Sequence, residues 1–85
     1  MGKNKKKESS EKEVVSEDLV KIGQKLRQIR TERGYSSYES FAWDNDIPRM
    51  QYWRMEKGKN FTFTSLIKIL DKLDISLKEF FEDFE

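Results

Sequence analysis

Residues 49–57 contain side chains that can recognise nucleic-acid bases. Arginine pairs with the O6 and N7 atoms of guanine, glutamine pairs with adenine, and a methionine side chain can contact the methyl group of thymine. On a helical wheel, Met50, Arg54 and Lys57 lie on the side opposite Tyr52. The spacing therefore predicts a helix that turns a basic, hydrogen-bonding face to solvent and anchors its other side in a core.

The composition excludes most enzyme chemistry. The 85 residues include no Cys and no His, which removes thiol nucleophiles, Ser-His pairs and the usual ligands of zinc. Only 35% of the residues are hydrophobic, so the chain can form one small domain and no large pocket. We expect no enzyme activity, no metal site and no cofactor.

The chain divides into a tail and a domain. Residues 1–15 carry five Lys against three Glu without an apolar period, and we expect a flexible, disordered basic tail there. Its lysines within residues 3–7 act either as a solubilising segment or as an arm that contacts phosphates. Residues 16–85 form the predicted domain. No apolar run is long enough for a membrane span or a signal peptide, so we expect a cytoplasmic protein.

Hydrophobic spacing predicts five short helices and no strand. The first begins at the cap Ser16 and ends at Gly34. The second opens with a capping box formed by Ser36 and Glu39, and it ends near Asp44 because turn-forming residues follow.

The remaining helices follow from their caps. Pro48 is acceptable in the first turn of the third helix, which is the segment with the basic face. Thr62 or Thr64 caps the fourth helix, and Ser76 with Glu79 forms a capping box for the fifth. Two short helices joined by a tight turn, second and third of five, form a helix-turn-helix layout.

Several aromatic residues have two interpretations. We expect Trp43 at the rim of the core, and for Trp53 we favour packing over stacking on DNA. Phe81 and Phe84 belong to a cluster of terminal Phe residues that exceeds the needs of one short helix. They are candidates for a dimer interface.

The segment from Ile22 to Phe81 resembles the lambda-repressor-like Cro/C1 family of helix-turn-helix domains, also called the XRE type. The resemblance rests on these residues: Ile22, Gly23, Leu26, Arg27, Ile29, Arg30, Gly34, Phe41, Ala42, Ile47, Arg54, Met55, Glu56, Lys57, Gly58, Lys59, Leu66, Leu70, Leu73, Ile75, Ser76, Leu77, Phe80 and Phe81. It implies an all-α, compact five-helix fold and sequence-specific DNA binding, commonly as a homodimer.

The resemblance also implies roles for individual residues. The base-contacting positions fall on Arg49, Met50 and Arg54, with Gln51 adjacent. The positions that contact the DNA backbone fall on Tyr38, Lys57, Lys59 and Asn60. A structural ion pair is implied between Arg30 and Glu56.

The turn between the second and third helices departs from the family pattern. Its usual Gly is missing around Asp46, so Asn45 or Asp46 must accept any left-handed conformation. Pro48 replaces the usual hydroxyl cap of the third helix. We therefore expect the fold to be kept and the details of docking to differ.

We expect a sequence-specific regulator of transcription that binds double-stranded DNA, with repression favoured, and that reads the major groove with the helix at 49–57. We expect a homodimer, no membrane association and no small-molecule effector domain.

Two alternatives stay open at this point. One is an antitoxin-type autorepressor that also binds a toxin protein. The other is a helical protein-interaction module that no longer binds DNA. A continuous positive surface at Arg49, Arg54, Lys57 and Lys59 without nearby acids would separate DNA binding from the second alternative.

Overall fold

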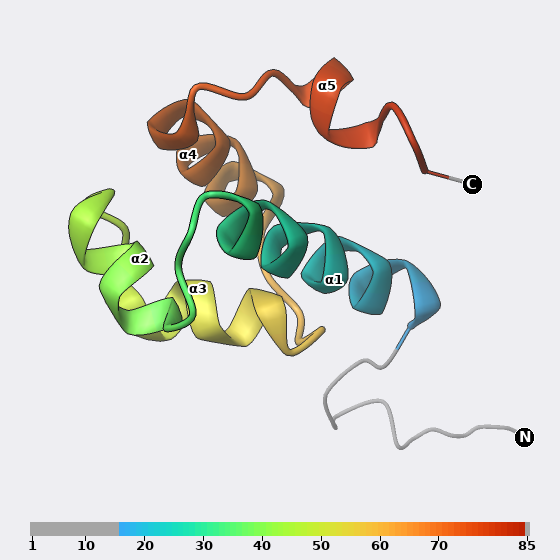
Figure 1. Cartoon of the computed structure of the whole chain (residues 1–85). Helices are drawn as coiled ribbons and strands as arrows, with labels where there is room; N and C mark the ends of the chain where they lie inside the picture. The colour runs from blue at the N-terminus through green and yellow to red at the C-terminus, as the bar shows by residue number, and fades with distance from the viewer. Residues whose placement is uncertain (1–15, 85) are drawn as a thin grey trace, which may run out of the picture.

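The computed structural model describes residues 16–84, and every regular element in this range is a helix (Figure 1). The helices are α1 (Glu17–Glu32), α2 (Tyr38–Asp44), α3 (Arg49–Glu56), α4 (Phe63–Leu73) and α5 (Leu77–Phe81). The expected all-α, five-helix fold is thereby confirmed. The basic tail at 1–15 and its lysines lie outside the described residues.

The long helix α1 forms for the reasons visible in its sequence. The Ser16 side chain accepts a hydrogen bond from the Leu19 N–H at 3.1 Å, which satisfies one of the free amides of the first turn. Beyond the last turn, Gly34 adopts a left-handed φ of 90° that favours glycine. The predicted bounds of this helix are correct to within two residues.

The start of α2 differs from the prediction by one residue. Ser37, and not Ser36, is the N-cap, and its hydroxyl oxygen accepts hydrogen bonds from the N–H groups of Glu39 and Ser40. The expected capping box of Ser36 with Glu39 is therefore wrong. Two adjacent serines can each act as a cap, and sequence alone does not decide between them.

The turn between α2 and α3 is closed without glycine. Asp46 takes the left-handed conformation with a φ of 57°, as one of the two residues expected to do so. Lys72 of α4 donates a hydrogen bond to the Asp46 carbonyl oxygen, and its Nζ lies 3.4 Å from Asp46 Oδ2. A contact from a distant helix thus stabilises the turn that sets the direction of α3.

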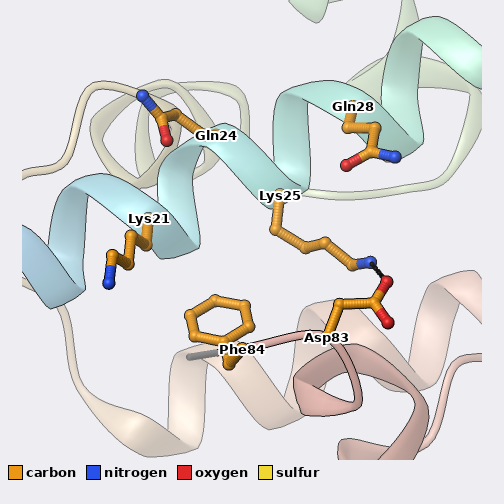
Figure 2. Close-up of a pocket in the computed structure, with 6 residues that line it drawn as sticks. All are labelled: Lys21, Gln24, Lys25, Gln28, Asp83 and Phe84. Carbon is orange, nitrogen blue, oxygen red and sulfur yellow. Dashed lines mark ion pairs between the residues drawn. The ribbon is translucent and has the colours of Figure 1, made fainter.

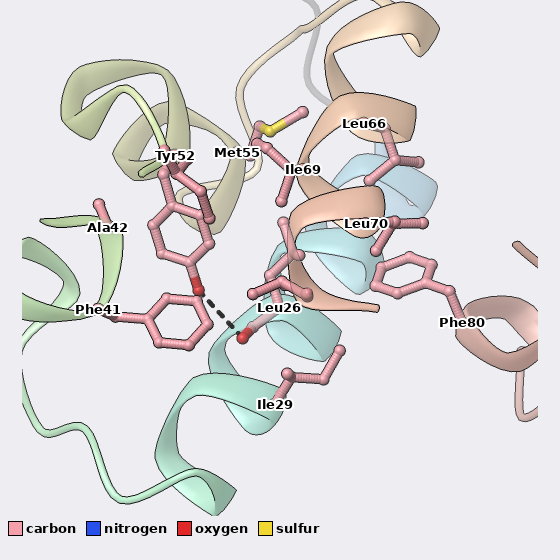
Figure 3. Packing of buried hydrophobic residues seen from close by; sticks show 12 residues of the cluster. Leu26, Ile29, Phe41, Ala42, Tyr52, Met55, Leu66, Ile69, Leu70 and Phe80 are labelled. Atoms are coloured by element: carbon pink, nitrogen blue, oxygen red, sulfur yellow. Dashed lines mark hydrogen bonds between the residues drawn. The ribbon is translucent and has the colours of Figure 1, made fainter. Parts of the chain in front are cut away.

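The core lies where α1, α2, α3 and α4 meet, and Phe80 of α5 completes it (Figure 3). Its buried residues are Leu26, Ile29, Phe41, Ala42, Ile47, Tyr52, Met55, Leu66, Ile69, Leu70, Leu73 and Phe80. The Tyr52 hydroxyl donates a hydrogen bond to the Leu26 carbonyl oxygen at 3.1 Å, which satisfies its polar end inside the core.

Trp43 is not part of the core or of its rim. Its exposed fraction is 86%, so the expected rim position is wrong. The reason is helical geometry, since α2 turns Phe41 and Ala42 inward and places Trp43 about 200° and 100° away from them.

The caps of α4 and α5 follow the sequence closely. Thr62, one of the two threonines considered, caps α4 by accepting a hydrogen bond from the Ser65 N–H at 3.2 Å. Ser76 and Glu79 form the predicted capping box at the start of α5. Hydrogen bonds from Ser76 to the Glu79 carboxylate lower the pKa of that group below its ordinary value.

Candidate nucleic-acid interface

The back of α3 is fixed by complete burial. Tyr52 and Met55 have no exposed surface, as the helical wheel predicts. The helix also lies unusually close to α1, because Gly23 presents its Cα to the carbonyl groups of Met55 and Glu56. These contacts prevent α3 from rotating about its own axis.

The residues expected to read bases lie on the opposite side of α3 or on its flanks. Arg49 and Lys57 are exposed, and Met50 has an exposed fraction of 54%. Gln51 and Arg54 are half-buried. The structure therefore gathers these five side chains on α3 and its C-cap residue Lys57, and Arg49, Met50 and Lys57 are the most exposed of them.

Glu56 is held on the inner side by the implied ion pair. Arg30 Nε donates to Glu56 Oε2 at 2.6 Å and Arg30 Nη2 donates to Oε1 at 3.2 Å, and both side chains are about 8% exposed. The hydrogen bond to Glu56 raises the pKa of Arg30 further above its already high ordinary value. The only carboxylate of α3 is thus neutralised and kept away from the basic face.

The positions implied to contact the DNA backbone lie at two places. Tyr38 is the first residue of α2 and is half-buried against the core. Lys59 and Asn60 follow α3, where the Lys59 N–H donates to the Arg54 carbonyl oxygen at 3.0 Å. The Asn60 side chain accepts a hydrogen bond from the Phe61 N–H, also at 3.0 Å, and the residue is exposed.

Trp53 lies between the two interpretations given to it. It is half-buried at the flank of α3, so part of its ring contributes to packing and part is accessible. The preference for packing stays a prediction.

Two hydrogen bonds near the interface were not expected from the sequence. Gln51 Nε2 donates to Ser65 Oγ at 2.6 Å, which joins α3 to the first turn of α4. Tyr35 donates through its hydroxyl to Asp44 Oδ2 at 2.7 Å, which raises the pKa of this tyrosine. No local sequence pattern predicts the hydrogen bond between Gln51 and Ser65, because this bond depends on how α4 is placed against α3.

The aromatic cluster at the end of the chain is partly used within the domain. Phe81 and Phe84 are half-buried, and their ring centroids lie 4.9 Å apart. A hollow beside Phe84 is lined by Lys21, Gln24, Lys25, Gln28 and Asp83, with Lys25 Nζ 3.5 Å from Asp83 Oδ2 (Figure 2). This ion pair holds the segment after α5 against α1.

Two features are absent from residues 16–84. No helix in this range is both long and apolar enough to cross a membrane. The same range contains no group of three or more Asp and Glu side chains placed to hold a metal ion.

Comparison with known proteins gives consistent relatives, although no model of a protein family matches the chain. The control protein C.MunI of a Mycoplasma species is 40% identical over 67 residues, which cover 78% of this chain and 90% of that protein.

Two crystal structures of restriction-modification controller proteins are similar in fold and sequence. C.AhdI from Aeromonas hydrophila is 36% identical with a TM-score of 0.64, and the match covers 78% of this chain and 100% of that one. Wild-type C.Esp1396I is 31% identical with a TM-score of 0.65, and the match covers 79% of this chain and 87% of that one. The relatives are regulatory proteins, so the expectation of a regulator and not an enzyme is confirmed. By its identity to C.AhdI and C.Esp1396I over most of the length of those proteins, the chain belongs to the restriction-modification controller proteins.

Proposed function

We propose that this chain is a sequence-specific regulator of transcription that binds double-stranded DNA and inserts α3 into the major groove. It uses the Cro/C1-type helix-turn-helix arrangement, in which the second of two short helices reads base edges. The related controller proteins support a role in regulating a restriction-modification system.

The distribution of charge around α3 carries the proposal. Between Ile47 and Leu70 the sequence has five basic residues and a single acid, Glu56. Because Glu56 is paired with Arg30 and both side chains are about 8% exposed, the one acid of this segment is neutralised, and the segment has an excess of positive charge. Such a surface fits a polyanion and disfavours the alternative of a protein-interaction module that has lost DNA binding.

The proposed interface makes two kinds of contact with DNA, one to base edges and one to the phosphate backbone. Arg49, Met50, Gln51 and Arg54 contact base edges. Tyr38, Lys57, Lys59 and Asn60 contact the phosphate backbone. Affinity then comes mainly from the phosphate contacts and sequence choice from the base contacts.

The protein acts as a homodimer. Phe81 and Phe84 keep accessible surface beside Leu77, whose exposed fraction is 38%, and this apolar area supports a two-fold interface. The operator then has two similar half-sites about 10 base pairs apart. Sedimentation of the full chain with and without the selected DNA measures the stoichiometry.

Selection of binding sites from random DNA tests the function directly. We expect the purified chain to enrich a two-fold motif. Arg54→Ala weakens binding to it by about 1–3 kcal/mol and relaxes the preference at one base pair. Lys57→Ala weakens all sequences similarly and lowers the slope of log affinity against log salt by about 0.9.

Lys78→Ala is the matched control. Lys78 is an exposed lysine on α5 and is not one of the residues proposed to contact DNA. It should bind as the unaltered protein does. Failure to enrich any motif, or equal effects of Lys57→Ala and Lys78→Ala together with no effect of Arg54→Ala, would contradict the proposal.

A further inference from the structure

One of the proposed base-reading side chains is attached to a helix outside the helix-turn-helix pair. Gln51 Nε2 donates a hydrogen bond to Ser65 Oγ at 2.6 Å. Gln51 is the third residue of α3 and Ser65 the third residue of α4. Both residues are half-buried, so the contact is partly protected from competition by water.

Ser65 is itself held in place on its other side. Its Oγ lies 2.9 Å from Thr62 Oγ1, and its backbone N–H donates to that same oxygen at 3.2 Å. Whichever hydroxyl donates, the Ser65 oxygen is fixed between the N-cap of α4 and the Gln51 amide. Because α4 carries four residues of the buried core, this anchor is part of the rigid body of the domain.

The attached amide lines a groove on the surface of the domain. The groove lies between α3 and the start of α4, and its lining residues are Gln51, Arg54, Asn60, Phe61, Thr62 and Ser65. A glutamine amide has one acceptor oxygen and two N–H groups. The contact with Ser65 uses one N–H, which leaves the oxygen and the second N–H as the donor and acceptor pair that adenine requires.

We infer that Ser65 is a specificity-determining positioning residue, which orients the Gln51 amide for adenine before DNA is bound. A free glutamine side chain loses rotamer entropy when it docks on a base, and an amide already held by Ser65 loses less of it. The inference rests on the proposed function, and it deepens it by assigning a residue of α4 to base selection.

The test compares variants at both ends of the contact. Affinity of the full chain is measured for the selected operator and for versions in which each A·T pair is replaced in turn. We expect Ser65→Ala to reduce discrimination at one A·T pair about tenfold, with the salt dependence of binding unchanged. Ser65→Thr, which keeps the hydroxyl, restores the discrimination. In a Gln51→Ala background, Ser65→Ala has no further effect on that pair.

Stability is a separate readout. The Thr62 cap of α4 depends on the Ser65 N–H and not on its hydroxyl, so Ser65→Ala keeps the cap. Its thermal midpoint should stay close to that of Ser40→Ala, a matched control at an exposed serine of α2.

The outcomes distinguish failure of the inference about Ser65 from failure of the proposed DNA-binding function. If Arg54→Ala and Lys57→Ala weaken binding but Ser65→Ala or Gln51→Ala leaves the preference at every base pair unchanged, the inference is wrong and the function stands. If Ser65→Thr fails to restore the preference lost in Ser65→Ala, the hydroxyl is not the positioning group and the inference is again wrong. If no variant changes binding to any sequence, the proposed function fails first.

Discussion

Gly23 of α1 lies against the last turn of α3, where a Cβ atom would be 2.5 Å from the Glu56 carbonyl oxygen and 2.6 Å from that of Met55. Real Cβ atoms do not approach backbone this closely, so any side chain at Gly23 forces the two helices apart. The contact sets the distance between the longest helix of the domain and the helix proposed to read DNA.

Gly23→Ala should destabilise the protein, although the same change in an exposed helix would stabilise it by up to about 1 kcal/mol. Here the added methyl group meets backbone atoms that cannot rotate away, and we expect a net loss of about 1–3 kcal/mol. Urea unfolding measures it. Gln24→Ala, at an exposed neighbour in α1, is the control and should change the free energy of unfolding little. A Gly23→Ala protein as stable as Gln24→Ala would show that α1 and α3 are not closely packed.

Arg30→Ala should cost about 3–5 kcal/mol of stability, because it leaves the Glu56 carboxylate buried without its partner. The change also removes the hydrogen bond from Arg30 to the Tyr35 carbonyl oxygen. Arg27→Ala, which alters an exposed arginine of the same helix, should be nearly neutral. The double variant Arg30→Met with Glu56→Met removes both charges together and should recover much of the loss. Chemical denaturation of the four proteins checks this, and similar losses for Arg27→Ala and Arg30→Ala would contradict it.

The protein should lose stability as the pH rises above 10. Burial, and then the nearby Glu56 carboxylate, raise the pKa of Tyr52 above its ordinary value of 10.0. The unfolded chain therefore releases the Tyr52 proton first, and the stability present below pH 10 falls by up to about 1.4 kcal/mol per pH unit above it. Denaturation from pH 8 to 11 measures this loss. Tyr52→Phe should show a correspondingly shallower decline, and parallel curves for the two proteins would contradict the assignment.

Trp43→Ala should leave stability within about 0.5 kcal/mol of the unaltered protein, because its side chain is largely exposed. Phe41→Ala, two residues earlier in α2, removes a fully buried ring and should cost about 3–5 kcal/mol. Thermal unfolding of both variants makes the comparison. Iodide should also quench Trp43 fluorescence in Trp53→Phe protein. A large stability loss in Trp43→Ala would place that ring in a core contact after all.

Much of the fold was accessible from local sequence. Caps such as Ser16 and the Ser76–Glu79 box act within one turn, so the pattern alone identifies them. Spacing also identified the buried side of α3, since Tyr52 and Met55 are completely buried. These features depend on contacts between residues three or four positions apart, which the sequence displays directly.

The features that the sequence predicted wrongly or did not predict depend on three-dimensional geometry, which residue type alone does not determine. Hydrophobicity alone favours a core position for Trp43, whereas the phase of a seven-residue helix decides which side chains face inward. The link between Gln51 and Ser65 spans 14 positions and appears only when α3 and α4 are placed together. The roles of individual residues in DNA contact stay predictions, because they depend on a docked duplex.

The short length of α3 makes its surface sensitive to substitutions elsewhere in the domain. Its eight residues begin at a proline that offers no capping side chain, and isolated helices of this length do not persist in water. The surface proposed to recognise an operator consequently exists only in folded molecules. A substitution deep in the core, far from any nucleotide, then lowers the concentration of competent regulator and changes the dose at which the regulated genes respond.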